Sequence, residues 1–217
     1  MSLRHIYVVR HGQRLAGNAN DQLGLGITET GKIQADFTGE RFKHIPVNVI
    51  HYSTMRRAAE TAKIIAQSLP NVRLQGSKFL WECIPYLPED FIIWYKVNRG
   101  RISDDSVTTP LQMAPWMGLW SPDTPWEVIE KGFQQAQQAW SHYFHPSREE
   151  RHDVLVCHGN ILRYFMVRAL KAPLETWINA DITNCGISEF TVHPGGEVAL
   201  VSHNDTGHLP VPIRTIA

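Results

Sequence analysis

The chain has 217 residues, of which 43% are hydrophobic and 19% charged, with 21 basic and 21 acidic side chains. This length suits one folded domain with a sizeable core, and this composition excludes a disordered or low-complexity protein. The formal net charge of +0 argues against a nucleic-acid or anionic-membrane partner, although a pocket can still be basic inside a neutral protein.

Strands and helices alternate along the first third of the chain. The β-branched and aromatic run at 4–10 predicts a buried strand that leads directly into His11. Thr28 can cap a helix that reaches about residue 44. The candidate core positions of this helix are Ile33, Phe37 and Phe42.

The same order repeats in the next segment. Residues 47–52 predict a second strand, and Ser53 or Thr54 starts a helix that reaches about residue 69. Residues 72–81 predict a third strand. A strand followed by a helix and another strand is typical of a parallel sheet with helical crossovers.

The periodicity fails between residues 83 and 125. Prolines, glycines and large aromatic residues alternate there without a helical or a strand period, which is typical of an irregular insertion or lid. We interpret 1–217 as a single domain that carries this insertion at about 83–125.

Regular elements return after the insertion. A helix opens at Pro125 and reaches about residue 143, followed by a strand at 153–157 and a helix at 160–170. Residues 185–192 and 198–202 predict a hairpin around a Pro-Gly-Gly turn. The whole pattern predicts an α/β fold, a three-layer α/β/α sandwich with a mostly parallel central sheet.

The cysteines and the absence of long apolar runs bear on the compartment. The three cysteines, Cys83, Cys157 and Cys185, contain no closely spaced Cys-x-x-Cys pair. This pattern is typical of buried, reduced thiols in an intracellular protein, and a zinc site is the alternative interpretation. No apolar run reaches the length of a membrane span, and no targeting segment precedes the first strand. We therefore expect an intracellular, soluble chain without a membrane segment, whose natural precursor could still be longer.

Polar side chains follow three predicted strands, at residues 10–12, 53–57 and 158–160. Because ligands in such sheets bind beyond the carboxyl ends of the strands, His11, His158 and the arginines should converge there if the strands are neighbours. Arginine forks match the oxygens of a phosphate. Neighbouring arginines also lower the pKa of a histidine from about 6.5, leaving a neutral nucleophile. Each motif alone is more often an ordinary loop, and the joint arrangement at strand ends favours phosphoryl transfer.

With these motifs the sequence resembles the histidine phosphatase superfamily, which includes cofactor-dependent phosphoglycerate mutase. Residues 8–12, Val-Val-Arg-His-Gly, resemble its nucleophile motif, and residues 53–62 resemble its phosphate-binding motif with the arginine at Arg57. Residues 27–35 match a third pattern of the superfamily. The resemblance implies a phosphoglycerate mutase-like fold and a covalent phosphohistidine on His11. The phosphate-binding residues that it implies are Arg10, Arg57 and His158, the last also catalytic, with no metal and no other cofactor.

Within the superfamily, three strings at 156–164, 168–177 and 205–210 resemble a mitochondrial group of protein Ser/Thr phosphatases. The acid catalyst of that group is a glutamate in a Leu-x-Glu setting, which the resemblance places at Glu82. The alternative for Glu82 is a surface carboxylate at a strand end. The implied activity is hydrolysis of phosphomonoesters with a phosphoprotein as the substrate partner, and a mitochondrial location rests on this resemblance only.

Other functions remain open on the sequence alone. A small-metabolite phosphatase or a phosphoglycerate mutase would use the same histidines. For a mutase, Lys96, Arg99 and Arg101 of the insertion could hold a second acidic group, although a solvated face is the more common reading of such residues. A different class of function is an inactive scaffold that binds phosphopeptides. Four intact residues, His11, Arg57, Glu82 and His158, argue against that scaffold, because a binding module has no need of an acid catalyst. Relatives form assemblies, so a homo-oligomer is also open.

Overall fold

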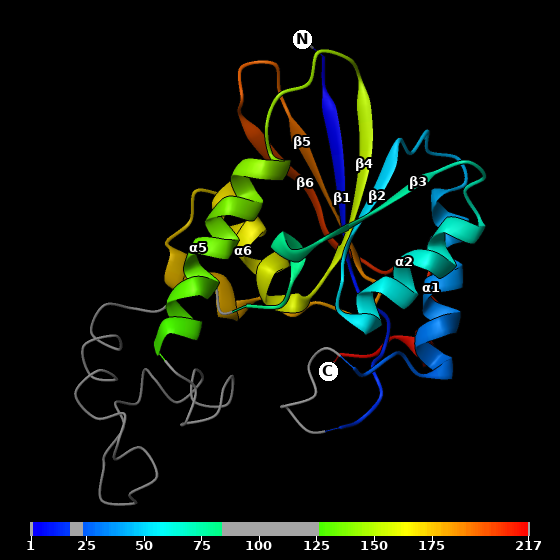
Figure 1. The fold of residues 1–217 in the computed structure, drawn as a ribbon. Coiled ribbons are helices and arrows are strands. Elements are labelled where there is room, and N and C mark those ends of the chain that lie inside the picture. The colour runs from blue at the N-terminus through cyan, green and yellow to red at the C-terminus, as the bar shows by residue number, and fades with distance from the viewer. Residues whose placement is uncertain (1, 18–23, 84–125, 217) are drawn as a thin grey trace, which may run out of the picture.

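The computed structural model describes residues 2–17, 24–83 and 126–216 (Figure 1). The insertion expected at about 83–125 therefore lies outside the described residues, apart from Cys83, and so do Lys96, Arg99, Arg101 and Pro125. The single-domain organisation of 1–217 stays a prediction.

Six strands form one sheet in the order β3-β2-β4-β1-β5-β6. The strands are β1 (Arg4–Arg10), β2 (Val49–Ser53), β3 (Arg73–Ser77), β4 (Arg151–Cys157), β5 (Ile187–Val192) and β6 (Val198–Asp205). The first four run parallel to one another, and β5 and β6 form an antiparallel hairpin against β1. The expected mostly parallel sheet is confirmed, with the hairpin at its edge.

Helices cover both faces of the sheet. The long helices are α1 (Glu29–Phe42), α2 (Arg56–Gln67), α5 (Trp126–Tyr143) and α6 (Gly159–Ala169). Figure 1 shows α1 and α2 on one side of the sheet and α5 and α6 on the other, which confirms the three-layer α/β/α sandwich. Short 3-10 turns lie at Lys78–Leu80, Leu174–Asn179 and Val211–Ile213.

Strand β1 contributes to two separate cores because its side chains alternate. Ile6 and Val8 pack into the core beneath α5 and α6, whereas Tyr7 and Val9 pack beneath α1 and α2. Both faces of the strand are therefore buried, which explains why its sequence reads as a continuous apolar run.

The core positions expected on α1 were partly wrong. Thr28 caps the helix through its side chain, as expected, and Phe42 is buried. Ile33 and Phe37, however, are 49% and 37% exposed. The buried face carries mostly small residues instead, because α1 lies very close to α2. A Cβ added at Gly39 would come within 3.1 Å of the Ile65 carbonyl oxygen.

Two boundaries differ from the sequence expectation. Helix α2 begins at Arg56 with Met55 as its N-cap, so neither Ser53 nor Thr54 caps it. Ser53 instead ends strand β2 with a fully buried side chain. Strand β3 stops at Ser77, because the chain turns into a 3-10 helix where the strand was expected to continue.

The three cysteines are all free thiols, Cys157 and Cys185 buried and Cys83 half-buried. None of the helices that the structure describes is both long enough and apolar enough to cross a membrane.

Candidate active site

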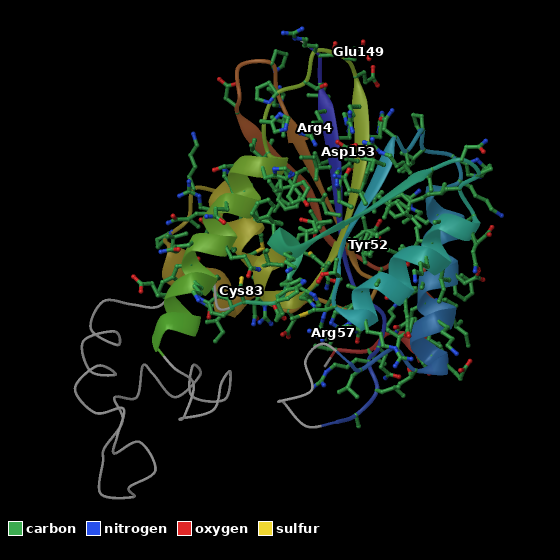
Figure 2. The ribbon with its side chains drawn as sticks, in the orientation of Figure 1. Arg4, Tyr52, Arg57, Cys83, Glu149 and Asp153 are labelled. Atoms are coloured by element: carbon green, nitrogen blue, oxygen red, sulfur yellow. The ribbon has the colours of Figure 1, made fainter. Side chains whose placement is uncertain are left out.

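The carboxyl ends of three adjacent strands bring the expected site residues together. In the order β2-β4-β1, Ser53 ends β2, His158 follows β4 and His11 follows β1. The rings of His11 and His158 lie 5.1 Å apart between centroids. Figure 2 places Arg57 at this same end of the sheet. The convergence expected from the sequence is therefore present.

His11 has the tautomer that a nucleophile requires. Its ring is 4% exposed, and its Nδ1 lies 2.8 Å from the Gly12 carbonyl oxygen. Because a carbonyl can only accept, Nδ1 carries the proton and Nε2 keeps its lone pair. Arg57 Nε donates to this Nε2 at 3.2 Å. Burial, followed by the charges of Arg10 and Arg57, lowers the pKa of His11 well below its usual value. The ring is therefore neutral at physiological pH.

The loop that carries His11 is held from several directions. Asn184 Nδ2 donates to the His11 carbonyl oxygen at 3.0 Å, and the Gly12 amide donates to Thr61 Oγ1 at 3.0 Å. A Cβ added at Gly12 would lie 2.5 Å from the Gly31 carbonyl oxygen, so only glycine lets the loop lie against α1. These contacts fix the position from which His11 can attack.

His158 lies at the N-cap of α6 with its side chain fully buried. Its Nε2 is 2.8 Å from Ser53 Oγ, which also accepts from the Met55 amide at 3.4 Å. If the Ser53 hydroxyl donates to Nε2, a neutral His158 carries its proton on Nδ1. Burial, followed by the nearby His11 and Arg57, lowers the pKa of His158 well below its usual value. Nδ1 is buried without a hydrogen-bond partner among the described residues.

Replacing Ser53 with alanine should lower kcat by about tenfold and change KM little, because Ser53 positions His158 without touching the substrate. The pH profile of kcat should change as well, because without the Ser53 hydroxyl the Nε2 of His158 is free to carry the proton in the other tautomer. Steady-state kinetics with a phosphomonoester measure both effects. Ser68→Ala, at the C-terminal end of α2, is the matched control, and equal kcat in the two variants would contradict the role of Ser53.

Two guanidinium groups face the histidine pair. Arg57 is 7% exposed and contacts Met55 Sδ through Nη2 at 3.4 Å, in addition to His11. Arg10 is half-buried and donates through Nη1 to the Ile182 carbonyl oxygen. Burial lowers the pKa of both arginines, but a guanidinium remains charged at physiological pH. Arg56 points away and pairs with Glu60 at 2.7 Å, so Arg57 is the arginine of this motif that faces the site.

Glu82 reaches the same group from the segment after β3. Its Oε1 accepts from the amides of Asn160 at 3.2 Å and Cys83 at 3.3 Å. Burial raises the pKa of Glu82, while the charges of Arg57 and Arg10 oppose that rise. A carboxyl with a raised pKa beside two phosphate-binding candidates suits an acid catalyst.

Several supporting residues were not found from the sequence. Gln34 Oε1 accepts from the Gln13 amide at 2.8 Å, and its Nε2 donates to the Ile213 carbonyl oxygen at 2.6 Å. Thr215 Oγ1 donates to Asn184 Oδ1 at 2.9 Å, so the C-terminal segment supports the His11 loop. Gln34 belongs to the pattern at residues 27–35, but its contacts, like the contact of Thr215 with Asn184, join residues far apart in the sequence and could not be read from it.

Arg163 is a further residue that the sequence analysis missed. It lies one turn after Asn160 on α6, donates to Asn160 Oδ1 at 3.1 Å, and donates to the Ala180 carbonyl oxygen at 2.6 Å. Burial lowers its pKa, and the charge of Glu82 opposes that change. Its position three residues after Asn160 on the same helix was the signal that could have identified it.

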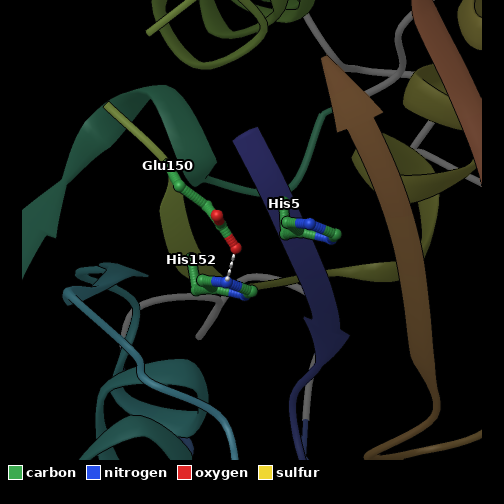
Figure 3. A group of neighbouring side chains, drawn as sticks. All are labelled: His5, Glu150 and His152. Atoms are coloured by element: carbon green, nitrogen blue, oxygen red, sulfur yellow. Dashed lines mark ion pairs between the residues drawn. The ribbon is translucent and has the colours of Figure 1, made fainter. Parts of the chain in front are cut away.

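A histidine and glutamate cluster lies at the opposite end of β1 (Figure 3). His5 and His152 are partners in the parallel register, and their rings stack at 4.5 Å. With Glu150 they form the one group of metal-binding type among the described residues, and it contains no cysteine. The two rings are 2° from parallel, so one must turn before both can ligate the same ion in its ring plane. Each ring already has a carboxylate neighbour, Glu189 for His5 and Glu150 for His152. The cluster is about 20 Å from His11 along the strand, too far to act on a phosphate there.

Comparison with known proteins identifies a family model, histidine phosphatase superfamily (branch 1), that matches residues 6–206. The serine/threonine-protein phosphatase PGAM5, mitochondrial, of Xenopus laevis is 33% identical over 215 residues, covering 95% of this chain and 67% of the relative. The Xenopus tropicalis and Drosophila melanogaster proteins of that name are 32% and 31% identical, covering 95% and 98% of this chain. The chain spans about two thirds of the length of these relatives, 66% in the latter two.

Solved structures share the fold. A phosphoglycerate mutase from Plasmodium falciparum superposes with a TM-score of 0.59 and 27% identity, covering 97% of this chain and 96% of that one. Bacillus stearothermophilus YhfR superposes with a TM-score of 0.67 and 21% identity, covering 95% and 100%. The second likeness concerns the fold alone.

Proposed function

This chain belongs to the histidine phosphatase superfamily (branch 1), and from that premise we propose that it hydrolyses the phosphomonoesters of phosphoserine and phosphothreonine in proteins. The observation that carries the proposal is the pairing of a buried, neutral His11 with Arg57 at its unprotonated Nε2. A bound substrate phosphate can replace His11 Nε2 as the hydrogen-bond partner of the Arg57 guanidinium. Its phosphorus atom then lies next to His11 Nε2.

The first step transfers the phosphoryl group to the protein. His11 Nε2 attacks phosphorus and forms an N–P bond as the bond to the leaving oxygen breaks. Glu82 gives its proton to that oxygen, so a serine or threonine hydroxyl leaves neutral. The raised pKa of Glu82 favours the protonated form that this step needs.

The second step returns the enzyme to its starting state. Glu82, now a carboxylate, takes a proton from water as the water oxygen attacks phosphorus. The N–P bond breaks, its electron pair returns to His11 Nε2, and inorganic phosphate leaves. One carboxyl thus serves as acid and then as base.

Positive groups stabilise the charge on the phosphoryl oxygens in both steps. Arg10 and Arg57 supply guanidinium donors, and His158 supplies the Nδ1 proton. Preorganised donors of this kind are the largest contribution to most phosphoryl transfers. Because these residues carry the charge, we expect turnover without a metal ion or another cofactor.

The substrate class rests on the relatives named PGAM5, which are serine/threonine-protein phosphatases. A mutase is the second candidate, because the Plasmodium falciparum phosphoglycerate mutase is 27% identical over nearly the whole chain. A mutase must keep the phosphohistidine from water, whereas a phosphatase must admit water.

The substrate class can be tested by measuring phosphate release from a phosphothreonine peptide, para-nitrophenyl phosphate and 3-phosphoglycerate in the presence of EDTA. The proposal expects kcat/KM to be highest for the peptide and to be unchanged by EDTA. Isomerisation of 3-phosphoglycerate without phosphate release would favour the mutase. Binding of the peptide without any turnover would favour an inactive phosphopeptide-binding scaffold, and loss of rate with EDTA would contradict the metal-free mechanism.

The mitochondrial location in the names of the relatives is part of the proposal for this chain, and so is self-association. Fractionation of cells and light scattering of the purified protein test the two points separately.

A further inference from the structure

A second basic cavity lies at the amino ends of β1 and β4, at the end of the sheet away from the candidate active site. Its volume is about 500 Å³. Its walls come from the starts of these strands, the last turn of α5 and the loop that follows α5. Figure 2 shows Arg4 and Asp153 toward this end of the sheet and Arg57 at the other. The charged and aromatic lining residues are Arg4, His51, His142, Tyr143, His145, Arg148 and Arg151.

The cavity carries an excess of positive charge. None of the described residues that line it is acidic. Asp153 lies fully buried beside it and accepts from Arg4 Nη2 at 2.7 Å and from Arg151 Nε at 2.8 Å. One carboxylate therefore faces three guanidinium groups, counting the exposed Arg148. Arg151 is held only through Nε within the described part of the chain, so its two terminal nitrogens remain for a ligand.

His51 is a buried polar group that nothing in the described fold satisfies. Its side chain is 8% exposed and packs edge-on against the Tyr143 ring, 5.1 Å between centroids. Its Nδ1 is buried without a hydrogen-bond partner among the described residues. Burial lowers the pKa of His51 to about 4, with Arg4, Arg151 and His142 adding to this effect and Asp153 opposing it. An anion in the cavity would act in the opposite sense.

We propose that this cavity is a second binding site, for a small dianion of the phosphate type. Arginine forks are matched to tetrahedral oxyanions, and the volume suffices for a phosphate ion or a compact phosphorylated metabolite. The seven residues of β1 separate Arg4 from Arg10 by about 20 Å, so one small ion cannot occupy this cavity and the active site together.

Histidine ring signals in NMR distinguish the two sites in the intact chain. Inorganic phosphate is titrated into the wild type and into Arg57→Ala, whose active site should have lost most of its affinity. The proposal expects phosphate to shift the His51 ring signals in both proteins and to raise the apparent pKa of His51 by a measurable amount. The signals of His11 and His158 should respond strongly in the wild type only.

Variants of the cavity test which residues bind. Arg148→Gln, which breaks no contact with Asp153, should weaken phosphate binding at His51 about threefold. Arg151→Gln should weaken it about tenfold, provided that circular dichroism shows an intact fold. Arg73→Gln on β3 is the matched control and should leave the affinity unchanged. Phosphate that shifts His11 and His158 but leaves His51 unmoved would overturn the inference, and so would equal affinities in Arg148→Gln and Arg73→Gln. Neither result would bear on the proposed phosphatase activity.

Discussion

Replacing His11 with alanine should lower kcat by about four orders of magnitude or more for every phosphomonoester, because the atom that bonds to phosphorus is gone. His158 cannot take over, since its Nε2 is engaged by Ser53. The affinity for phosphate should fall far less, because Arg10 and Arg57 remain. Phosphate release measures the loss, and phosphorus NMR of acid-free quenched samples should lack the phosphohistidine signal that the wild type gives.

The pH dependence gives an independent check on the same residue. Burial and the charges of Arg10 and Arg57 hold the pKa of His11 well below its usual value, so the ring stays neutral as the pH falls. Protonation of His11 should therefore cause no loss of the wild-type rate as the pH falls through about 6.5, where an ordinary histidine titrates. His44→Ala, an exposed histidine, is the matched control. A His11→Ala variant with the same rate as His44→Ala would place the nucleophile elsewhere.

The sequence predicted the elements whose signals are local. The run at 4–10 is the observed β1, and Thr28 is the observed N-cap of α1. The sequence-based prediction failed where packing between distant segments determines which residues are buried. Ile33 and Phe37 were expected on the core face, but the face of α1 that is buried carries mostly small residues where α1 lies close to α2. Ser53 has good capping chemistry, yet it ends a buried strand and serves His158 instead.

The candidate site likewise contains some residues that local motifs identify and others that only the tertiary structure brings in. His11, Arg57 and His158 belong to short motifs at strand ends, and the strand order then brings them together. Asn184 holds the His11 loop from a position that no motif identifies, and Gln34 holds it from the pattern at residues 27–35. The pairing of His5 with His152, like the sharing of Asp153 by Arg4 and Arg151, depends on the parallel register of β1 and β4. Register between strands separated by most of the chain cannot be read from local sequence patterns.

Glu82→Gln should separate the two chemical steps, because the same carboxyl is asked to act as acid and then as base. Glutamine keeps the oxygen that accepts from the Asn160 and Cys83 amides, so the segment should stay in place. With a phosphothreonine peptide, whose alkoxide leaves poorly, we expect kcat to fall 10²- to 10⁴-fold and no phosphoenzyme to accumulate. With para-nitrophenyl phosphate the leaving group needs no proton, so transfer to His11 should survive.

The loss of the base should then appear as a burst. Rapid mixing of Glu82→Gln with para-nitrophenyl phosphate should release about one equivalent of nitrophenolate per active site, followed by slow turnover as water attacks without assistance. In the wild type, the raised pKa of Glu82 means that peptide turnover declines as the pH rises through that pKa, and the variant should lack this decline. Glu130→Gln, an exposed carboxylate on α5, is the matched control. Equal losses for both substrates without a burst would mean that Glu82 positions the site rather than moving protons, since proton transfer is the only contribution that depends on the leaving group.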